Sequence, residues 1–235
     1  MSLGKYIGAG AGWFLGGPIG GLIGYYIGKS FFSEVNDQQK AYEISLLILS
    51  SLVIKADGKV LKSELEFVRV FFTKTFGNQK SDQYFKVFNK LNKASFESKL
   101  RPICLQLNSN LQHSERIEIV HFLFGIAAAD NEVHQSEINL IAKIADYLNV
   151  NKYDLDSIKA MFVRSKSNTN IDYCFQILEI NKEATDDEVK KAYRKMCLKF
   201  HPDKLQGVSV DIKKLAEEKF IAVKDAYERI IKTRK

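Results

Sequence analysis

Residues 185–204 read TDDEVKKAYRKMCLKFHPDK, and this stretch decides the fold of the C-terminal part of the chain. Thr185, followed three residues later by Glu188, is the capping-box pattern that opens a helix. Apolar side chains recur behind it at helical spacing, so the pattern predicts an amphipathic helix. Pro202 fixes its own φ and disfavours helical geometry in the preceding residue, which predicts that the helix ends in a stiff turn.

The apolar face of this helix predicts its packing partner. A second amphipathic helix follows after a loop, and we expect the two to form an antiparallel hairpin with residues 201–203 at its tip. A short helix is expected before them, at residues 173–180. The facing apolar residues are Val189, Ala192, Tyr193, Met196 and Phe200 on the first long helix and Phe220, Val223, Ala226, Tyr227 and Ile230 on the second.

A His-Pro-Asp turn between two such helices resembles the J-domain family, and the resemblance covers residues 171–235. It implies a protein that docks on a DnaK-type chaperone and stimulates the ATPase of that partner, without enzymatic activity of its own. The Asp203 carboxylate at the stiff tip is suited to pairing with an arginine of the partner. The chaperone-binding residues that the resemblance implies are His201, Pro202, Asp203, Lys190, Lys191, Arg194, Lys195 and Lys199.

The five basic residues form a stripe on the outer face of the helix and lead directly into the tripeptide. Such a stripe steers binding toward an acidic surface and speeds the encounter. Nucleic acid is not the expected partner, because exposed aromatic side chains do not alternate with the basic ones. The chain also has no Gly/Phe-rich region and no zinc-binding cysteine cluster, which excludes the layout of a full DnaJ protein.

The first 30 residues carry a regular row of glycines. Residues 6–27 include no charged side chain, and Lys5 and Lys29 flank them. A helix of this length, at 1.5 Å per residue, is long enough to span the hydrocarbon core of a bilayer. Glycine repeats every four residues at Gly4, Gly8, Gly12, Gly16, Gly20, Gly24 and Gly28.

Two arrangements of this segment fit the pattern. In the favoured one, a single kinked helix spans the membrane and pairs with a second copy through a groove of small residues, which predicts a homodimer. The residues of that groove are Gly8, Gly12, Gly16, Gly20 and Gly24. In the other arrangement the chain turns back at residues 16–18, where Pro18 removes a helical hydrogen bond, and forms a re-entrant or peripheral hairpin.

A nine-residue motif occurs twice in the middle of the chain. Residues 56–64 read ADGKVLKSE and residues 129–137 read ADNEVHQSE, and each copy follows one apolar helical pattern and precedes another. Gly58 and Asn131 are residue types that accept the left-handed backbone found at the end of a helix. Each copy therefore predicts a corner between two helices.

The residues that open the second helix of each corner are also predicted. Ser63 and Ser136 are natural N-caps for the helices that follow. Glu66 stands three residues after Ser63, in the spacing of a capping box.

The repeated corner resembles the TerB family, an all-helical family named for tellurite resistance. The matching acidic positions of that family have been linked to divalent metal, and the resemblance places them at Asp57, Glu64, Asp130 and Glu137. Two carboxylates per corner could hold a hard cation. We favour a structural role, because the spacing is not that of an EF-hand loop and acidic residues are expected beside helix ends for capping and for the helix dipole.

The composition fits a globular protein in a reducing compartment. Of the 235 residues, 46% are hydrophobic, and the formal net charge of +7 permits binding to acidic surfaces. The three cysteines, Cys104, Cys174 and Cys197, are scattered along the chain. This spacing argues against a disulfide framework and against a zinc site.

Together these segments predict an all-α chain of three parts. They are a glycine-rich membrane segment at 1–30, a TerB-like helical bundle at 36–164 and, after a polar linker at 165–170, a J-domain at 171–235. This order resembles the membrane-anchored DnaJ-like co-chaperones, which implies a single-pass protein of the bacterial inner membrane with its C-terminal domains in the cytoplasm. The alternative function is a metal- or stress-sensing scaffold, in which the TerB-like part is the active element and the J-domain recruits the chaperone.

Overall fold

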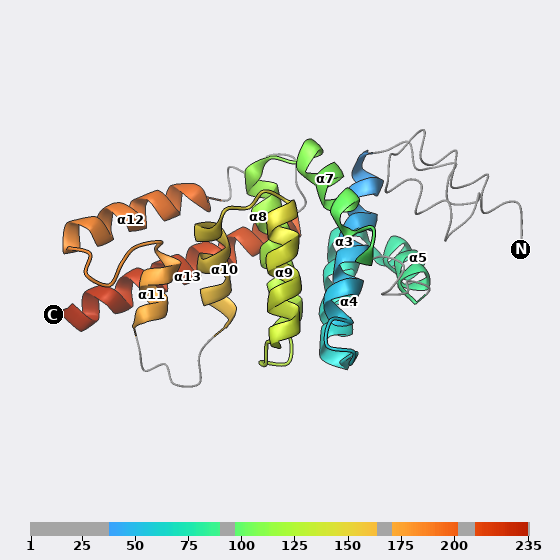
Figure 1. Cartoon of the computed structure of the whole chain (residues 1–235), viewed down its shortest axis with the longest axis horizontal. Coiled ribbons are helices and arrows are strands. Elements are labelled where there is room, and N and C mark those ends of the chain that lie inside the picture. The colour runs from blue at the N-terminus through green and yellow to red at the C-terminus, as the bar shows by residue number, and fades with distance from the viewer. Residues whose placement is uncertain (1–37, 90–96, 164–170, 202–209, 235) are drawn as a thin grey trace, which may run out of the picture. The chain divides into compact units, whose positions relative to one another are not determined.

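The computed structural model describes residues 38–89, 97–163, 171–201 and 210–234, and these ranges contain helices and connecting loops but no strand (Figure 1). The all-α prediction is therefore confirmed for them. The chain divides into two compact units, one up to Leu111 and one from Gln112 onward.

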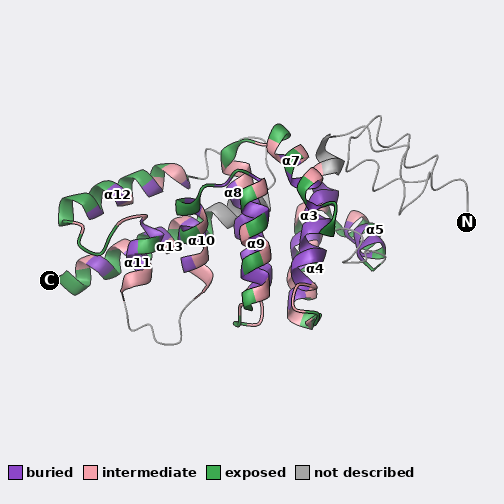
Figure 2. Ribbon diagram, viewed as in Figure 1, coloured by how far each residue is buried: buried purple, intermediate pink, exposed green. Residues whose placement is uncertain are grey.

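The first unit contains four helices among its described residues. They are α3 (Gln38–Ile54), α4 (Lys62–Phe76), α5 (Asn78–Phe88) and α7 (Leu100–Asn110). Helix α3 contacts the other three and is buried at every position from 43 to 54, as Figure 2 shows in purple. Glu43 lies in this buried stretch, and its carboxylate accepts hydrogen bonds from the Tyr84 hydroxyl and from Lys80 Nζ at 3.3 Å. Helix α5 thus supplies the polar partners that a buried carboxylate requires.

The second unit combines helices from both predicted domains. They are α8 (His113–Ala127), α9 (Gln135–Tyr147), α10 (Lys152–Phe162), α11 (Asp172–Ile177), α12 (Asp186–Lys199) and α13 (Val210–Arg234). Helix α8 contacts α9, α10 and α13, while α11 packs on both α10 and α13. Helices α12 and α13 run antiparallel beside each other, as predicted (Figure 1). The end of the TerB-like stretch and the J-domain therefore share one core.

The division between the two units does not coincide with the expected linker. It falls between Leu111 and Gln112, inside the stretch expected to be one TerB-like bundle. The linker at 165–170 lies outside the described residues. The domain bounds given above accordingly stay predictions.

The expected membrane segment at 1–30 also lies outside the described residues. Among the helices that the structure does describe, none combines the length and the apolar character needed to cross a bilayer.

The backbone of the two repeated corners is as predicted. Gly58 has φ +84° and Asn131 has φ +67°, both in the left-handed region. In each corner the aspartate closes the turn, because Asp57 Oδ1 accepts from the Lys59 N–H at 2.8 Å and Asp130 Oδ1 accepts from a backbone N–H at 3.0 Å. The two copies of the motif thus form the same local structure.

The predicted N-caps Ser63 and Ser136 are wrong. Helix α4 begins at Lys62 and α9 at Gln135, so both serines lie inside the first turn. The reason is that buried glutamates reach back to the residue before each helix. Glu64 Oε2 accepts from the backbone N–H of Leu61 at 2.9 Å, and Glu137 Oε2 accepts from that of His134 at 2.8 Å.

Replacing Glu64 by alanine should lower the free energy of unfolding by about 1 kcal/mol, because the Leu61 N–H loses its acceptor. Glu66→Ala is the matched control, since Glu66 is exposed on the same helix, and it should change stability by no more than ~0.5 kcal/mol. Urea unfolding followed by circular dichroism measures both. If Glu66→Ala lowered the free energy of unfolding more than Glu64→Ala, the result would instead support the predicted capping box of Ser63 and Glu66.

Candidate functional site

The start of helix α12 has the predicted capping box. Thr185 Oγ1 accepts from the Glu188 N–H at 3.3 Å, and Glu188 Oε2 accepts from the Thr185 N–H at 2.7 Å. Arg234, near the end of α13, donates to Asp186 Oδ1 and to the Ala184 carbonyl, both at 2.7 Å. The first turn of α12 is therefore fixed by its own cap and by the C-terminal helix.

The apolar stripe of α12 packs as predicted. Val189, Met196 and Phe200 are buried, and so are Val223, Ala226 and Ile230 of α13. The Tyr193 and Tyr227 rings stack, with centroids 4.4 Å apart and planes at 17°. Stacked rings and a continuous apolar contact make the hairpin a stiff support for its tip.

The tip itself is described only at its first residue. His201 is exposed, and its ring meets that of Phe220 edge to face at 6.4 Å. Pro202 and Asp203 lie outside the described residues, so the roles assigned to them stay predictions.

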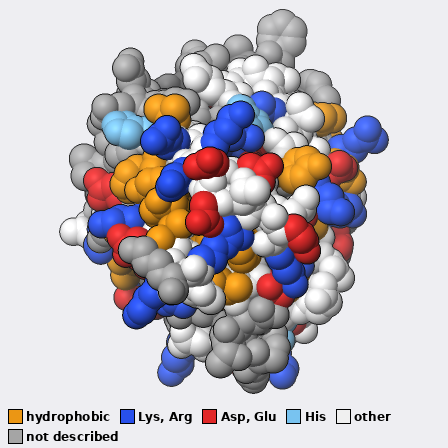
Figure 3. Space-filling view, turned by 90° about the vertical axis from the view of Figure 1, so that its left-hand side faces the viewer, with side chains coloured by type: hydrophobic (Ala, Val, Ile, Leu, Met, Phe, Trp, Pro, Cys, Tyr) orange, Lys and Arg blue, Asp and Glu red, His pale blue; other side chains and the backbone are white. Residues whose placement is uncertain are grey.

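Four of the five predicted basic residues, Lys190, Lys191, Arg194 and Lys195, are exposed on α12. Figure 3 faces the end of the molecule where α12 begins and shows Lys and Arg side chains interspersed with Asp and Glu. Lys199 differs from these four, because its side chain is only 22% exposed and forms ion pairs with Asp154 and Glu179. The structure thus separates an outward-facing basic group from one inward-facing lysine.

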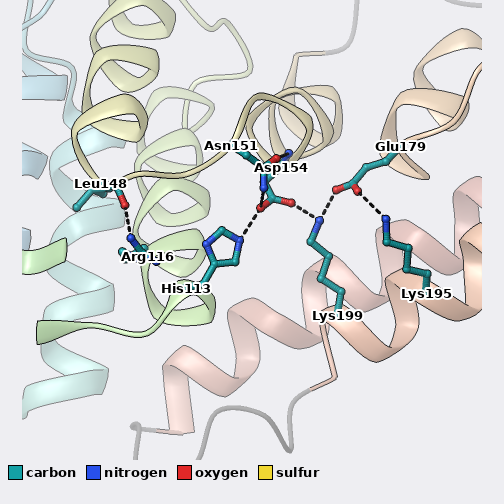
Figure 4. A network of polar contacts seen from close by, with 8 residues as sticks. All are labelled: His113, Arg116, Leu148, Asn151, Asp154, Glu179, Lys195 and Lys199. Carbon is teal, nitrogen blue, oxygen red and sulfur yellow. Dashed lines mark hydrogen bonds and ion pairs between the residues drawn. The ribbon is translucent and has the colours of Figure 1, made fainter. Parts of the chain in front are cut away.

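Lys199 is the centre of a polar network that joins α12 to the TerB-like helices (Figure 4). Asp154 of α10 pairs with Lys199 and lies 2.7 Å from His113 Nε2 through its other oxygen. Asn151 Nδ2 donates to that same oxygen at 2.8 Å. On the far side, Glu179 pairs with Lys199 and lies 4.0 Å from Lys195.

The electrostatics of the network follow from burial and from the shared lysine. Burial by itself would raise the pKa of the Asp154 carboxyl, but the ammonium group of Lys199 and the His113 ring outweigh it, and the pKa is lowered. For Glu179 burial prevails over the attraction of Lys199, and the pKa is raised. One cation between two carboxylates thus links α10, α12 and Glu179 in the loop after α11.

A second ion pair lies deeper in the same unit. Lys219 of α13 is fully buried and pairs with Glu118 of α8. Burial lowers the pKa of the Lys219 ammonium and raises that of the Glu118 carboxyl. The Lys219 Nζ lies 5.0 Å from the centre of the Phe200 ring, and Lys199 Nζ lies 5.6 Å from it. The ring of the residue before His201 thus contacts two lysines, and each of these lysines pairs with a carboxylate of a TerB-like helix.

Sequence reasoning missed the carboxylates of both pairs. Asp154 and Glu118 come from helices that precede the J-domain, and spacing along the chain does not show contacts of this range. One signal was available for Glu118, because it stands within the apolar run from Ile117 to Ala127. A charged residue in such a run is expected to have a buried partner.

The four candidate metal ligands, Asp57, Glu64, Asp130 and Glu137, bond to backbone N–H groups of their own corners. Within the described ranges, no group of three or more His, Cys, Asp or Glu side chains converges as a metal site would require. The geometry therefore gives each carboxylate a structural role, and a metal at these corners stays a prediction.

Comparison with known families agrees with both halves of this architecture. Residues 43–160 match the family model of tellurite resistance protein TerB, and residues 173–235 match that of the DnaJ domain. The chain belongs to the TerB family and carries a DnaJ domain at its C-terminal end.

Two co-chaperones are similar to this chain beyond the DnaJ domain, one of them over its full length. Co-chaperone protein DjlA of Coxiella burnetii is 26% identical over 270 aligned residues, which cover 99% of this chain and 98% of that protein. Co-chaperone protein DjlA of Shewanella oneidensis is 32% identical over 114 residues, 44% of each chain. The chain is DjlA-like.

The DnaJ domain alone has relatives in longer proteins. Chaperone protein DnaJ of Treponema denticola is 47% identical over 61 residues, which make up 26% of this chain but only 15% of that protein. No solved structure matches the chain.

Acid should destabilise the second unit through His121. This side chain is buried beside Phe162, with ring centroids 4.8 Å apart, and burial together with the charge of Lys219 lowers its pKa well below 6.5. The unfolded chain then binds a proton that the folded one does not, so stability falls as the pH drops below about 6.5, by at most ~1.4 kcal/mol per pH unit.

His121→Phe should flatten this decline between pH 7 and pH 5, measured by urea unfolding at each pH. The control is His134→Gln, which removes an exposed histidine and should leave the decline as it is in the wild type. Parallel curves for the wild type and His121→Phe would contradict a role for this histidine.

Proposed function

We propose that this protein is a co-chaperone that docks on a DnaK-type chaperone and stimulates its ATPase. The observation that carries the proposal is a stiff, capped hairpin whose exposed basic residues, Lys190, Lys191, Arg194 and Lys195, lead to the exposed His201 at its tip. The DjlA and DnaJ relatives support it. On this account the protein acts on a partner's active site and has none of its own.

Each part of the hairpin has its own role in docking. The basic residues attract an acidic surface and orient the encounter, an effect that salt weakens. Pro202 keeps the turn stiff, so that little conformational entropy is lost when the tip is bound. The Asp203 carboxylate then pairs with a cationic group of the chaperone at the end of this rigid arm.

We also propose that residues 6–27 anchor the protein in the bacterial inner membrane, with the J-domain in the cytoplasm and a second copy paired along the glycine row. The support is the uncharged length of this stretch and the unbroken four-residue spacing of its glycines. The nucleotide and the partner chaperone are both available on the cytoplasmic side.

Asp203→Asn should abolish stimulation of the partner's ATPase, because it removes only the charge that pairs with the chaperone. A lost charged hydrogen bond costs roughly 1.5–3 kcal/mol, so stimulation should fall by about tenfold or more. Single-turnover ATP hydrolysis measures it. Asp225→Asn makes the same change at an exposed position of α13 and should have no effect. Stimulation by Asp203→Asn within about twofold of the wild type would overturn the proposed role of the tip.

The glycine row can be tested with two matched double variants. Gly12→Leu with Gly20→Leu fills the row and should reduce crosslinking between copies in membranes. Gly10→Leu with Gly21→Leu adds the same apolar bulk off the row and should leave crosslinking intact. Both variants should stay in the membrane, because leucine favours insertion. Equal crosslinking would exclude pairing along the row, and release of the wild type by carbonate would exclude the membrane span.

A further inference from the structure

A surface groove runs beside α12 and is shared by three segments of the second unit. It has a volume of about 720 Å³, which is room for several side chains of a partner. Tyr153 lines it from α10, and the loop between α11 and α12 lines it with Glu179, Ile180, Asn181, Glu183 and Ala184. Helix α12 contributes Glu188, Lys191, Ala192 and Lys195. The basic side of the J-domain hairpin and a TerB-like helix thus border one hollow.

Tyr153 is the unusual member of this lining. It is 73% exposed, more than any other large apolar side chain of the described residues. Its position is not arbitrary, because the next residue, Asp154, is buried and pairs with Lys199 of α12. The ion pair fixes the start of α10 against α12, so an exposed aromatic ring is held at the groove that Lys191 and Lys195 also line.

The groove carries charges of both signs, and its cationic groups, Lys191 and Lys195, both lie on α12. Glu179 is engaged by Lys199 and Lys195, and the Glu188 carboxylate accepts hydrogen bonds from the Thr185 N–H and hydroxyl. Glu179 is thus paired within the protein, whereas the Thr185 hydrogen bonds lower the pKa of the Glu188 carboxyl and favour its charged form. Glu183 is a further exposed acidic residue of the lining. Lys191 remains exposed, and the Lys195 side chain is 73% exposed. On the α12 side of the groove, an acidic partner surface would meet two exposed lysines close to a tyrosine, one of the residue types enriched among interface anchors.

We propose that Tyr153 belongs to the chaperone-docking surface, so that the acidic face of the DnaK-type partner contacts the TerB-like helix α10 as well as the J-domain. The inference rests on the proposed function, because its occupant is the same chaperone. Tyr153 lines the same groove as Lys191 and Lys195, so a chaperone surface that binds the two lysines lies beside the tyrosine ring. The TerB-like part then contributes directly to recognition.

The test is a titration of the chaperone with the full-length protein in detergent, read as the concentration that gives half-maximal ATPase stimulation. Tyr153→Ala should raise this concentration roughly tenfold, and Tyr153→Phe should stay close to the wild type. Ile221→Ala is the matched control, because Ile221 is 57% exposed and lines a different hollow of the same unit. It should leave the concentration unchanged.

Salt dependence separates an apolar anchor from a charge effect. Tyr153→Ala should shift the half-maximal concentration equally at low and high ionic strength, whereas Lys191→Glu with Lys195→Glu should weaken docking most at low ionic strength.

The outcomes show whether the role of Tyr153 or the proposed co-chaperone function is wrong. If Tyr153→Ala behaves as the wild type while the double lysine variant weakens docking, Tyr153 lies outside the surface and the inference fails alone. If Ile221→Ala is the variant that weakens docking, the partner sits on the other hollow, and the inference again fails. If neither the lysine variant nor Asp203→Asn changes stimulation, the proposed function itself is wrong.

Discussion

Lys219 of α13 is fully buried, and its ammonium group pairs with the carboxylate of Glu118 on α8. Removing two charges from water costs several kcal/mol, which only a well-placed partner offsets. Loss of either residue would leave the other buried without its partner, which is strongly destabilising, so the pair requires the two helices to stay together. Because α8 belongs to the TerB-like part and α13 to the DnaJ domain, this pair joins the two parts within the second unit.

The consequence is that the DnaJ domain is not an independent module at the end of a linker. Lys199 repeats the pattern of Lys219 on the other side of the tip, pairing with Asp154 of α10. The ammonium groups of both lysines lie close to the ring of Phe200, the residue before His201. The residue at the base of the hairpin tip therefore contacts two lysines that are each paired with a TerB-like helix.

Local chemistry was predictable from the sequence, and long-range pairing was not. The Thr185 capping box, the α12 stripe and the left-handed backbone at Gly58 and Asn131 all follow from residues a few positions apart. The prediction that Ser63 and Ser136 are N-caps was wrong. In each corner the buried glutamate one residue later accepts the backbone hydrogen bond that defines the start of the helix. The Glu118–Lys219 pair joins residues that are 101 positions apart. The local sequence pattern of one helix does not predict that its charged residue pairs with the other helix.

The central claim is that the DnaJ domain is locked to the TerB-like helices by buried ion pairs. A double-mutant cycle with Glu118→Leu and Lys219→Met, measured by urea unfolding, tests it most directly. We predict that each single variant is strongly destabilised and that the double variant recovers much of the loss, with a coupling energy of at least about 1 kcal/mol. Additive losses, with a coupling energy within ~0.3 kcal/mol of zero, would contradict the account.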